Sequence, residues 1–374
     1  MNDHPDSLLL DPDQTIVRVI GDDGELDAVH DPHLSDDEIV ALHAAMVRTR
    51  IIDERLVSLQ RQGRIGFHIG SLGEEATIIG SAYALRPSDF IFPAYREFGA
   101  ALLRGFPLQS YFDNMFGNRR DPARGRQMPD HYTSAKTRFA SISSPIGTQI
   151  IHAVGFAVAA RIRGDDVVTL AYFGEGATSS NDFHNGMNFA GVMRAPTVML
   201  CRNNGWAISV PPERQTAARS FAEKGRAYGV RYVRCDGNDV FAVIRVTREA
   251  VQRASSGGGP TLVECLTYRM SGHSTSDDPT IYRTADDLEA WRLRDPIGRL
   301  RALMVSRGLW DDDKQAELER GIDAEIAVAI EQAESAGPPP LESMFEDVYA
   351  TVPRHLQEQR EQLLSGPRPF LAHR

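Results

Sequence analysis

The sequence contains no long hydrophobic run. No segment of its 374 residues approaches the stretch of about 18 apolar residues that a membrane-spanning helix needs. It also has no excess of basic residues, since 51 Asp and Glu outnumber 41 Lys and Arg and give a net charge of -10. Proteins that bind nucleic acid usually present a basic surface. We therefore expect neither a membrane-spanning protein nor a partner of DNA or RNA.

Cysteine is scarce, and a signal peptide is not evident. Cys201, Cys235 and Cys265 lie in or beside expected buried strands and show no CxxC or Cys/His spacing. We expect them to pack as small hydrophobic side chains and not to bind zinc. The acidic N-terminus, MNDHPDSLLLDPDQ, lacks the basic and apolar regions of a secretory signal, so a cytoplasmic location is expected.

The common phosphate-binding loops are also missing around residue 175. Gly174-Glu175-Gly176 is not followed by the Gly-Lys-Ser/Thr of a Walker A loop, and the pattern is not GxGxxG. This acidic turn instead follows the run VVTLAYF at 167–173, and a pair of asparagines ending at Asn204 follows a second apolar run at 197–201. Such runs are typical of strands buried on both faces of a parallel sheet.

Residues 181–193 have helical composition, so the segment 167–204 is expected to form a βαβ unit whose strands end at one edge. Glu175 and Asn204 would then offer a carboxylate and an amide oxygen, the hard ligands that Mg²⁺ prefers. Gly174 and Gly176 would let the backbone turn tightly and approach a ligand. A glycine pair around an acid is by itself more often an ordinary turn, but the asparagines favour a site for Mg²⁺ and a diphosphate.

The remaining pattern predicts an α/β protein, with a mostly parallel sheet and helices on both faces. Ser35 and Glu38 form a capping box that begins a helix ending near residue 62. The other expected elements are a short strand at 15–20, helices at 73–85 and 97–105, a long loop at 117–141, a helix at 146–163, a strand at 232–235, a helix at 239–255, a strand at 261–268, and two charged helices between 286 and 335. We divide the chain into an extended arm (1–34), an α/β domain (35–270), a mobile active-site loop (271–285) and a C-terminal helical region with a tail (286–374).

The expected helix at 146–163 is apolar around most of its circumference, with Gly155 and several alanines at its centre. A helix of this kind needs cover on every side. We therefore expect it to lie at a subunit interface, because a lone subunit would expose a large apolar patch.

Several segments, in order between residue 31 and about residue 300, carry a resemblance to a known family. They include RQGRIGFHIGSLGEEA, PAYREFGAALLRGFP, SISSPIGTQIIHAVG, YFGEGATS, CRNNGWAIS and YRMSGHSTSDDPTIYRT. The chain resembles the alpha subunits of thiamine-diphosphate-dependent 2-oxo acid dehydrogenases, and most of all the branched-chain members. The resemblance implies the thiamine-diphosphate-binding fold and covers most of the chain.

The resemblance also implies a set of site residues. Glu175, Asn204 and the main-chain carbonyl of Trp206 match the ligands of Mg²⁺. The positions that match contacts to thiamine diphosphate are Tyr95, Arg96, Ser144, Gly176, Ala177, Arg202 and His273. Those that match a K⁺ site of branched-chain relatives are Ser143, Pro145, Thr148 and Gln149. Guanidinium groups suit phosphate oxygens, and a helix beginning after Gly176 would favour an anion.

Outside this context, His273 would be an ordinary solvated histidine, and Arg96 and Arg202 would be surface arginines. Within the motifs, we expect His273 to be catalytic, by orienting or exchanging protons with the reacting carbonyl or lipoyl group. His68 and His131 lie in matching segments and are equally compatible with structural roles.

Two positions depart from the wider family pattern. Glu175 stands in Gly-Glu-Gly where the general motif has Gly-Asp-Gly, although this subfamily also carries the longer acid. Trp206 stands where relatives commonly have tyrosine. Because the expected metal ligand is the backbone carbonyl of Trp206, its side chain does not decide whether the metal binds.

The resemblance implies a reaction and partners. The expected reaction is oxidative decarboxylation of a branched-chain 2-oxo acid, with transfer of the acyl group to a lipoyl-bearing acyltransferase. The glutamate that activates the aminopyrimidine ring comes from a beta subunit, so two alpha and two beta subunits are expected to form a heterotetramer. A pyruvate or acetoin dehydrogenase alpha subunit and a non-catalytic assembly subunit stay open as alternatives. A self-sufficient transketolase-type enzyme would need a second domain, for which 374 residues leave no room.

Overall fold

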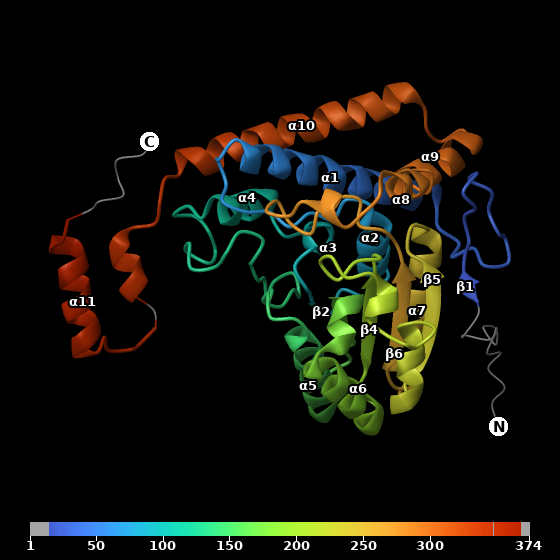
Figure 1. Ribbon diagram of the computed structural model, residues 1–374, viewed down its shortest axis with the longest axis horizontal. Coiled ribbons are helices and arrows are strands. Elements are labelled where there is room, and N and C mark those ends of the chain that lie inside the picture. The colour runs from blue at the N-terminus through green and yellow to red at the C-terminus, as the bar shows by residue number, and fades with distance from the viewer. Residues whose placement is uncertain (1–14, 347, 368–374) are drawn as a thin grey trace.

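Within the part of the chain that the computed structural model describes, residues 15–346 and 348–367, six parallel strands form one sheet (Figure 1). Their order across the sheet is β1-β5-β6-β4-β3-β2. The strands are β1 (Ile16–Val17), β2 (Phe90–Phe92), β3 (Thr169–Gly174), β4 (Thr197–Asn203), β5 (Arg231–Asp236) and β6 (Thr261–Leu266). The predicted α/β class and parallel sheet are confirmed.

Alternate residues of the central strands pack into two different cores. In β3, Leu170 and Tyr172 belong to the larger cluster, whereas Ala171 and Phe173 belong to the smaller one on the opposite face. All four side chains are fully buried. The apolar run at 167–173 therefore lacks polar alternation because helices cover both faces of the sheet.

The larger core is formed with α1 (Asp36–Arg61), α2 (Glu75–Tyr83), α3 (Phe98–Leu103), α4 (Leu108–Phe116) and α7 (Val240–Ser255), and the smaller one with α5 (Thr148–Arg163) and α6 (Asn181–Met193). The predicted capping box is present at the start of α1, where Ser35 accepts from the Glu38 amide and the Glu38 side chain accepts from the Ser35 amide. Neither β2 nor α4 was expected from the sequence.

The C-terminal region contains more helices than predicted. Three helices, not two, lie between the sheet domain and residue 336: α8 (Ala285–Arg292), α9 (Pro296–Ser306) and α10 (Asp312–Ser335). Asp295 caps α9 and Pro296 occupies its first turn, which interrupts the charged segment and separates α8 from α9. α10 lies along α1 (Figure 1), to which Arg48–Glu325 and Arg55–Asp323 ion pairs join it.

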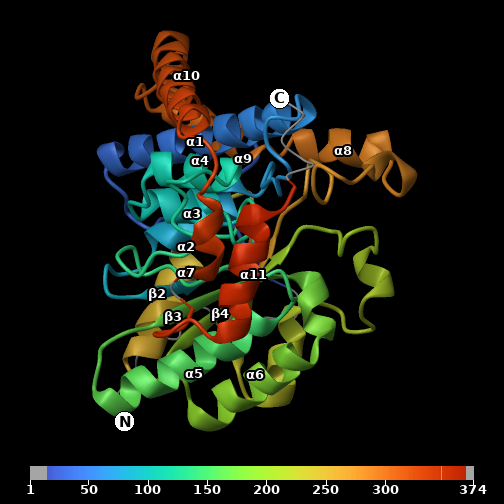
Figure 2. The same ribbon diagram turned by 90° about the vertical axis from the view of Figure 1, so that its left-hand side faces the viewer.

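The expected tail also contains helical structure. After α10 the chain forms the short 3-10 helix η5 (Leu341–Phe345) and the helix α11 (Arg354–Ser365). Both lie apart from the sheet in Figure 1, and Figure 2 shows α11 from the side on which it projects. None of the helices in residues 15–346 and 348–367 combines the length and apolarity required to cross a membrane.

The described part of the N-terminal arm is anchored to the sheet. Only Ile16–Val17 of the predicted strand at 15–20 forms regular structure, and it pairs with β5. The carboxylate of Asp239, which caps α7, accepts the amides of Val19 at 2.6 Å and Ile20 at 2.7 Å. Residues 1–14 of the predicted arm lie outside the described residues.

The three cysteines are free and buried, as predicted. Cys235 and Cys265 are neighbours on β5 and β6, with their sulfur atoms 3.5 Å apart. The described residues of this chain, in contrast, cover helix α5 on only one side: Ala153 and Ala157 face the core, while Ile162 is 78% exposed. The expected subunit interface on α5 remains a prediction.

Candidate active site

The predicted site residues meet at the carboxyl edge of the sheet. Tyr95 and Arg96 follow β2, Glu175 follows β3 and Asn204 follows β4, and parallel strands bring these ends together. They surround a cavity of about 540 Å³. The predicted residues that line it are Tyr95, Arg96, Ser144, Gln149, Glu175, Gly176, Ala177, Arg202, Asn204, Trp206 and His273. Ser143, Pro145 and Thr148 are not among its lining residues; they lie in the segment that leads into α5 and at its first position.

Glu175 is the buried carboxylate of this cavity. Its Oε2 accepts a hydrogen bond from the backbone N–H of Asn204 at 3.3 Å, and its Oε1 accepts one from the side-chain Nε2 of Gln215 at 3.3 Å. Burial raises the pKa of the Glu175 carboxyl, because few charges compensate for the loss of water. A bound cation would stabilise the ionised form. No sequence motif pointed to Gln215, which lies in an irregular segment.

The backbone around Glu175 differs from the expectation in two ways. No α-helix begins after Gly176; residues Glu175–Ser179 form the 3-10 helix η1, and α6 begins later, capped by Ser180. Gly174 has an ordinary φ of -78° and open space where a Cβ would lie, so its turn does not require glycine. At Gly176, however, a Cβ would come within 2.7 Å of Cβ of Ala207. Only Gly176 is therefore required for close approach.

Asn204 is held at both ends of its amide. Nδ2 donates to Oε1 of Glu74 at 3.0 Å, and Oδ1 accepts the Trp206 amide at 3.2 Å. The carbonyl of Trp206, an expected metal ligand, accepts Nη1 of Arg269 at 3.3 Å. No group of three or more His, Cys, Asp or Glu side chains among the described residues could hold a metal ion. A metal here would therefore rely on one carboxylate together with neutral oxygens and the ligand.

Arg202 lines the cavity, but two buried carboxylates occupy its guanidinium. Nη1 pairs with Glu74, and Nη2 pairs with Glu97 at 2.6 Å. Burial alone would lower the pKa of Arg202, but Glu97 and Glu74 raise it. Burial raises the pKa of the Glu97 carboxyl, although Arg202 opposes the shift. Arg202 was expected to contact the cofactor, and the sequence did not single out the two acids that pair with it.

Arg96 and His273 form a direct pair across the cavity. Arg96 Nη2 donates to His273 Nδ1 at 3.1 Å and to its carbonyl at 2.8 Å, while Nη1 donates to the Gly70 carbonyl. Because arginine can only donate, Nδ1 must accept, and neutral His273 carries its proton on Nε2. Burial, assisted by the positive charges of Arg96 and Arg269, lowers the pKa of His273 to about 4.

His68 has a structural position. Its ring is fully buried between two aspartates, with Nε2 2.9 Å from Asp53 and Nδ1 3.1 Å from Asp130. Burial would lower its pKa, but Asp130 and Asp53 raise it to about 10. The same aspartates accept the amides of Ile69 and Ser71. This network fixes the segment whose Gly70 carbonyl holds Arg96.

His131 lies behind Ser144. Its Nδ1 is 2.9 Å from the carbonyl of Pro129 and its Nε2 is 2.6 Å from Oγ of Ser144. A carbonyl only accepts, so Nδ1 carries a proton, and the Ser144 hydroxyl donates to Nε2 when the imidazole is neutral. His131 thus orients Ser144, a lining residue of the cavity.

Gln149 carries a buried amide oxygen with no hydrogen-bond partner among the described residues. Its Nε2 donates to the carbonyl of Tyr172 at 2.9 Å, while Oε1 accepts no hydrogen bond from them. Such an atom is unusual in a folded protein and indicates that a ligand could bind beside it.

The segment after β6 packs against the cavity through residues that lie in a quoted motif but were not predicted as site residues. Asp277 accepts the His273 amide at 2.6 Å and also the hydroxyl of Tyr282. Arg269 Nη2 donates to that hydroxyl at 2.6 Å. These contacts hold His273 at the cavity wall. The mobility expected for residues 271–285 remains a prediction.

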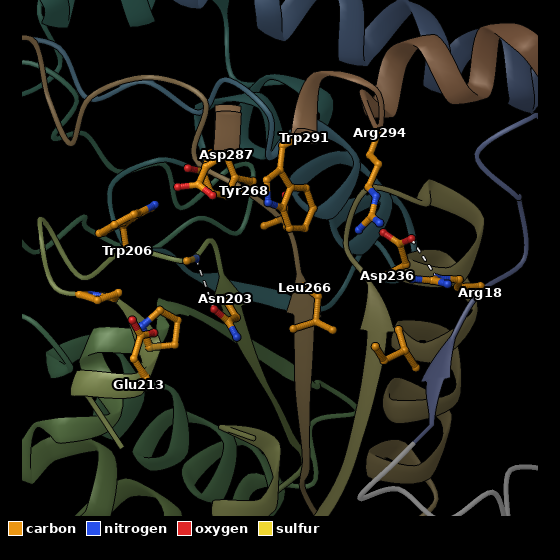
Figure 3. A pocket seen from close by; sticks show the side chains of 15 residues that line it. Arg18, Asn203, Trp206, Glu213, Asp236, Leu266, Tyr268, Asp287, Trp291 and Arg294 are labelled. Carbon is orange, nitrogen blue, oxygen red and sulfur yellow. Dashed lines mark hydrogen bonds and ion pairs between the residues drawn. The ribbon is translucent and has the colours of Figure 1, made fainter. Parts of the chain in front are cut away.

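A second cavity, of about 500 Å³, adjoins the first, and Trp206 lines both (Figure 3). Tyr268 and Trp291 stack on one of its walls, with ring centroids 5.2 Å apart. Arg18 pairs with Asp236 on another side, at 3.3 Å. Among the predicted site residues, only Trp206 lines this cavity.

Comparison with known proteins shows similarity over most of the chain. The family model described as Dehydrogenase E1 component matches residues 43–342. The 2-oxoisovalerate dehydrogenase subunit alpha of Pseudomonas aeruginosa is 40% identical over 356 residues, which cover 93% of this chain and 87% of that protein. The mitochondrial 2-oxoisovalerate dehydrogenase subunit alpha of Mus musculus is 41% identical over 350 residues, or 93% of this chain and 79% of that protein. The mitochondrial 2-oxoisovalerate dehydrogenase subunit alpha 2 of Arabidopsis thaliana is 42% identical over 359 residues, which cover 94% of this chain and 76% of that protein.

Proposed function

Because this chain belongs to the Dehydrogenase E1 component family, we propose that it is the alpha subunit of a branched-chain 2-oxo acid dehydrogenase. The observation that carries the proposal is the match, along most of both chains, to relatives named 2-oxoisovalerate dehydrogenase subunit alpha. The reaction is the oxidative decarboxylation of branched-chain 2-oxo acids, coupled to reductive acylation of a lipoyl group. Thiamine diphosphate is the cofactor of this reaction.

The residues that line the larger cavity fit thiamine diphosphate and Mg²⁺. Glu175 supplies a buried carboxylate whose pKa burial raises, so a cation beside it would relieve the cost of its charge. Glu175, the Asn204 amide oxygen and the Trp206 carbonyl would hold Mg²⁺, and Gly176 and Ala177 would approach the diphosphate through their backbone. The Trp206 carbonyl would exchange its contact with Arg269 for the metal. Arg202, paired with Glu74 and Glu97, would supply one cation beside the phosphates.

The cofactor brings the nucleophilic carbon and the electron sink for decarboxylation. Around the cofactor, the residues of this chain would bind and orient the reacting groups and exclude water. The centroid of the Tyr95 ring lies 5.4 Å from Cζ of Arg96, and Tyr95 closes one side of the cavity. Ser144, held by His131, presents its oxygen as a hydrogen-bond acceptor. His273, neutral and protonated on Nε2, would donate a hydrogen bond to the reacting carbonyl or to the lipoyl group.

Oxygen atoms of the segment before α5 and of the first turn of α5 would suit a monovalent cation. Oε1 of buried Gln149, which accepts no hydrogen bond from the described residues, is available as an oxygen ligand. Ser143, Pro145 and Thr148 would complete a K⁺ site by their oxygens. Bound K⁺ would stabilise the turn that presents Ser144 to the cavity.

The chain supplies only part of the catalytic machinery under this proposal. A beta subunit would bring the acid that activates the aminopyrimidine ring, and two alpha and two beta subunits would form the active heterotetramer. A lipoyl-bearing acyltransferase would accept the acyl group. A cytoplasmic location remains a prediction.

Turnover by the chain purified with its beta subunit tests the function. We expect faster reductive acylation of a lipoyl group with 3-methyl-2-oxobutanoate than with pyruvate or acetoin, and the reaction should depend on added thiamine diphosphate. A preference for pyruvate or acetoin would assign the chain to another substrate class of the same family. Absence of all three activities in a complex that binds cofactor would favour a non-catalytic assembly subunit.

A further inference from the structure

Glu74 lies directly behind the proposed metal site, in the motif GSLGEEA, to which the proposed function assigns no metal-binding group. Its side chain is fully buried. The preceding Gly73 has a φ of +92°, and a Cβ there would come within 2.4 Å of the Tyr268 carbonyl. A glycine is therefore needed at 73 for the chain to pass this carbonyl and place Glu74 beside β4.

Each carboxylate oxygen of Glu74 has one partner at the site. Oε1 accepts Nδ2 of Asn204 at 3.0 Å, and Oε2 pairs with Nη1 of Arg202. Both partners lie at the end of β4 and line the cavity. Glu74 is thus connected to a proposed metal ligand and to the proposed phosphate-side cation at once.

The contact with Asn204 determines which end of the amide faces the cavity. The two ends of an asparagine amide have nearly the same shape, so hydrogen bonds decide its orientation. A carboxylate only accepts, so Nδ2 must point toward Glu74. Oδ1 then lies on the other side, where it accepts the Trp206 amide at 3.2 Å.

We infer that Glu74 is a positioning residue for the metal site: it fixes Asn204 with its amide oxygen toward the cation and holds Arg202 in place. The inference rests on the proposed function, because it takes Mg²⁺ and thiamine diphosphate as the ligands. If the Asn204 amide turned over, its oxygen would face the Glu74 carboxylate and its NH₂ group would face the cation. Outer partners of metal ligands commonly change metal affinity by about 10- to 100-fold.

Two single substitutions, one on each side of the Glu74–Asn204 contact, test this assignment. We expect Glu74→Gln to weaken Mg²⁺-dependent binding of thiamine diphosphate by about tenfold or more, because glutamine accepts or donates and no longer fixes the amide. Asn204→Asp adds a charge that should by itself improve a Mg²⁺ ligand. With Glu74 intact, however, it places two carboxylates about 3 Å apart, the present Asn204–Glu74 distance. We therefore expect Asn204→Asp to weaken binding as well.

The double variant Glu74→Gln/Asn204→Asp distinguishes orientation from a general structural defect. Aspartate presents an oxygen in either orientation, and the glutamine introduced by Glu74→Gln can donate to its second oxygen. We expect the double variant to bind about tenfold tighter than Glu74→Gln alone. Calorimetric titration of the alpha-beta complex with thiamine diphosphate, at fixed Mg²⁺ concentrations, measures these affinities without reference to turnover.

Glu75→Gln is the matched control. Glu75 is equally buried and adjacent in sequence, but its carboxylate pairs with Arg50 at 2.8 Å and accepts the Gly73 backbone amide at 3.0 Å, a bond that the side-chain oxygen of glutamine can keep. We expect it to retain wild-type Mg²⁺-dependent binding even if its melting temperature falls. Additive losses in the double variant would overturn the inference. Tighter Mg²⁺ binding by Asn204→Asp alone would also overturn it, and this measurement does not depend on the folding of any Glu74 variant. Lack of Mg²⁺-dependent binding by the wild-type complex would instead overturn the proposed function.

Discussion

At the residue scale, the protonation state of His273 limits its possible chemistry. With a pKa of about 4, lowered first by burial and then by Arg96 and Arg269, the imidazole is neutral at physiological pH. Since this pKa lies below the usual value for histidine, about 6.5, the native state holds the proton less tightly than the unfolded chain. The contribution of His273 to stability is therefore complete above about pH 6.5 and is lost as the pH falls toward 4.

Replacement of Arg96 by methionine should move this titration. Arg96→Met removes a positive charge and the donor to Nδ1, so we expect the pKa of His273 to rise toward its usual range. NMR titration of histidine-labelled protein would show the shift directly, and the acid limb of the kcat profile should move to higher pH. Arg64→Met, which breaks the exposed pair with Glu334, should leave both measurements unchanged. An unaltered His273 titration in Arg96→Met would contradict the pairing.

Glu175 should show opposite effects on binding and on stability. Its buried carboxyl has a raised pKa, so ionised Glu175 costs free energy in the ligand-free protein at neutral pH. We expect Glu175→Gln to abolish Mg²⁺-dependent binding of thiamine diphosphate, while the melting temperature without ligand stays equal or rises. Calorimetric titration and thermal unfolding monitored by circular dichroism measure the two effects. A large fall in the melting temperature would show that Glu175 stabilises the fold.

At the scale of elements, Asp239 joins the N-terminal arm to the sheet domain. It accepts the amides of Val19 and Ile20 with one oxygen and those of Phe241 and Ala242, in the first turn of α7, with the other. All four bonds are buried. One side chain therefore both caps a helix and fixes β1 beside β5.

Asp239→Ala should lower the free energy of unfolding by about 3 kcal/mol, because it leaves buried amides without acceptors and removes a helix cap. Chemical denaturation measures the change. Ser35→Ala, which removes an exposed cap of α1, should cost only about 1 kcal/mol. Equal losses in the two variants would mean that the arm contributes little to the stability of the fold.

The sequence predicted elements well where local patterns were strong. The run around Leu170 and the capping box at Ser35 predicted β3 and the start of α1, and residues 181–193 are α6 as expected. β2 was missed because it has only three residues and is followed by Pro93, so no periodicity could develop. α8 and α9 were not separated because only a short connection joins them.

The sequence predicted the residues that line the cavity but not the residues that hold them in position. Glu175, Asn204 and His273 follow strands in recognisable motifs, and the cavity brings them together. Glu74 and Glu97 reach Arg202 from segments far away in sequence, at contacts that only the tertiary fold creates. Such pairs have no local signature, so a single sequence cannot reveal them.

At the scale of the whole molecule, α5 and α6 leave large apolar side chains uncovered. Ile162 is 78%, Phe189 54% and Val192 74% exposed, and Arg161 joins the ends of the two helices by donating to the Met193 carbonyl. A protein in complex would bury such side chains. These helices are therefore the surface that we expect to contact another subunit.

Glutamate at this surface should prevent assembly. We expect Ile162→Glu and Phe189→Glu to remain folded but to lose association with the beta subunit, because a charge would be buried in an apolar contact. Size-exclusion chromatography with light scattering would detect the loss. Val328→Glu on α10, where the side chain is 52% exposed, is the matched control and should assemble normally. Normal assembly of Ile162→Glu and Phe189→Glu would place the interface elsewhere.

The complete burial of the three thiols has a practical consequence for spectroscopy. Because Cys201, Cys235 and Cys265 are shielded from solvent, a maleimide dye would react slowly with the native chain. Ser256→Cys would add a single accessible thiol in the exposed connection from α7 to β6, at the edge of the sheet opposite the cavity. A donor fluorophore there, with an acceptor on a partner subunit, would report docking in real time from a chain that keeps all its native cysteines.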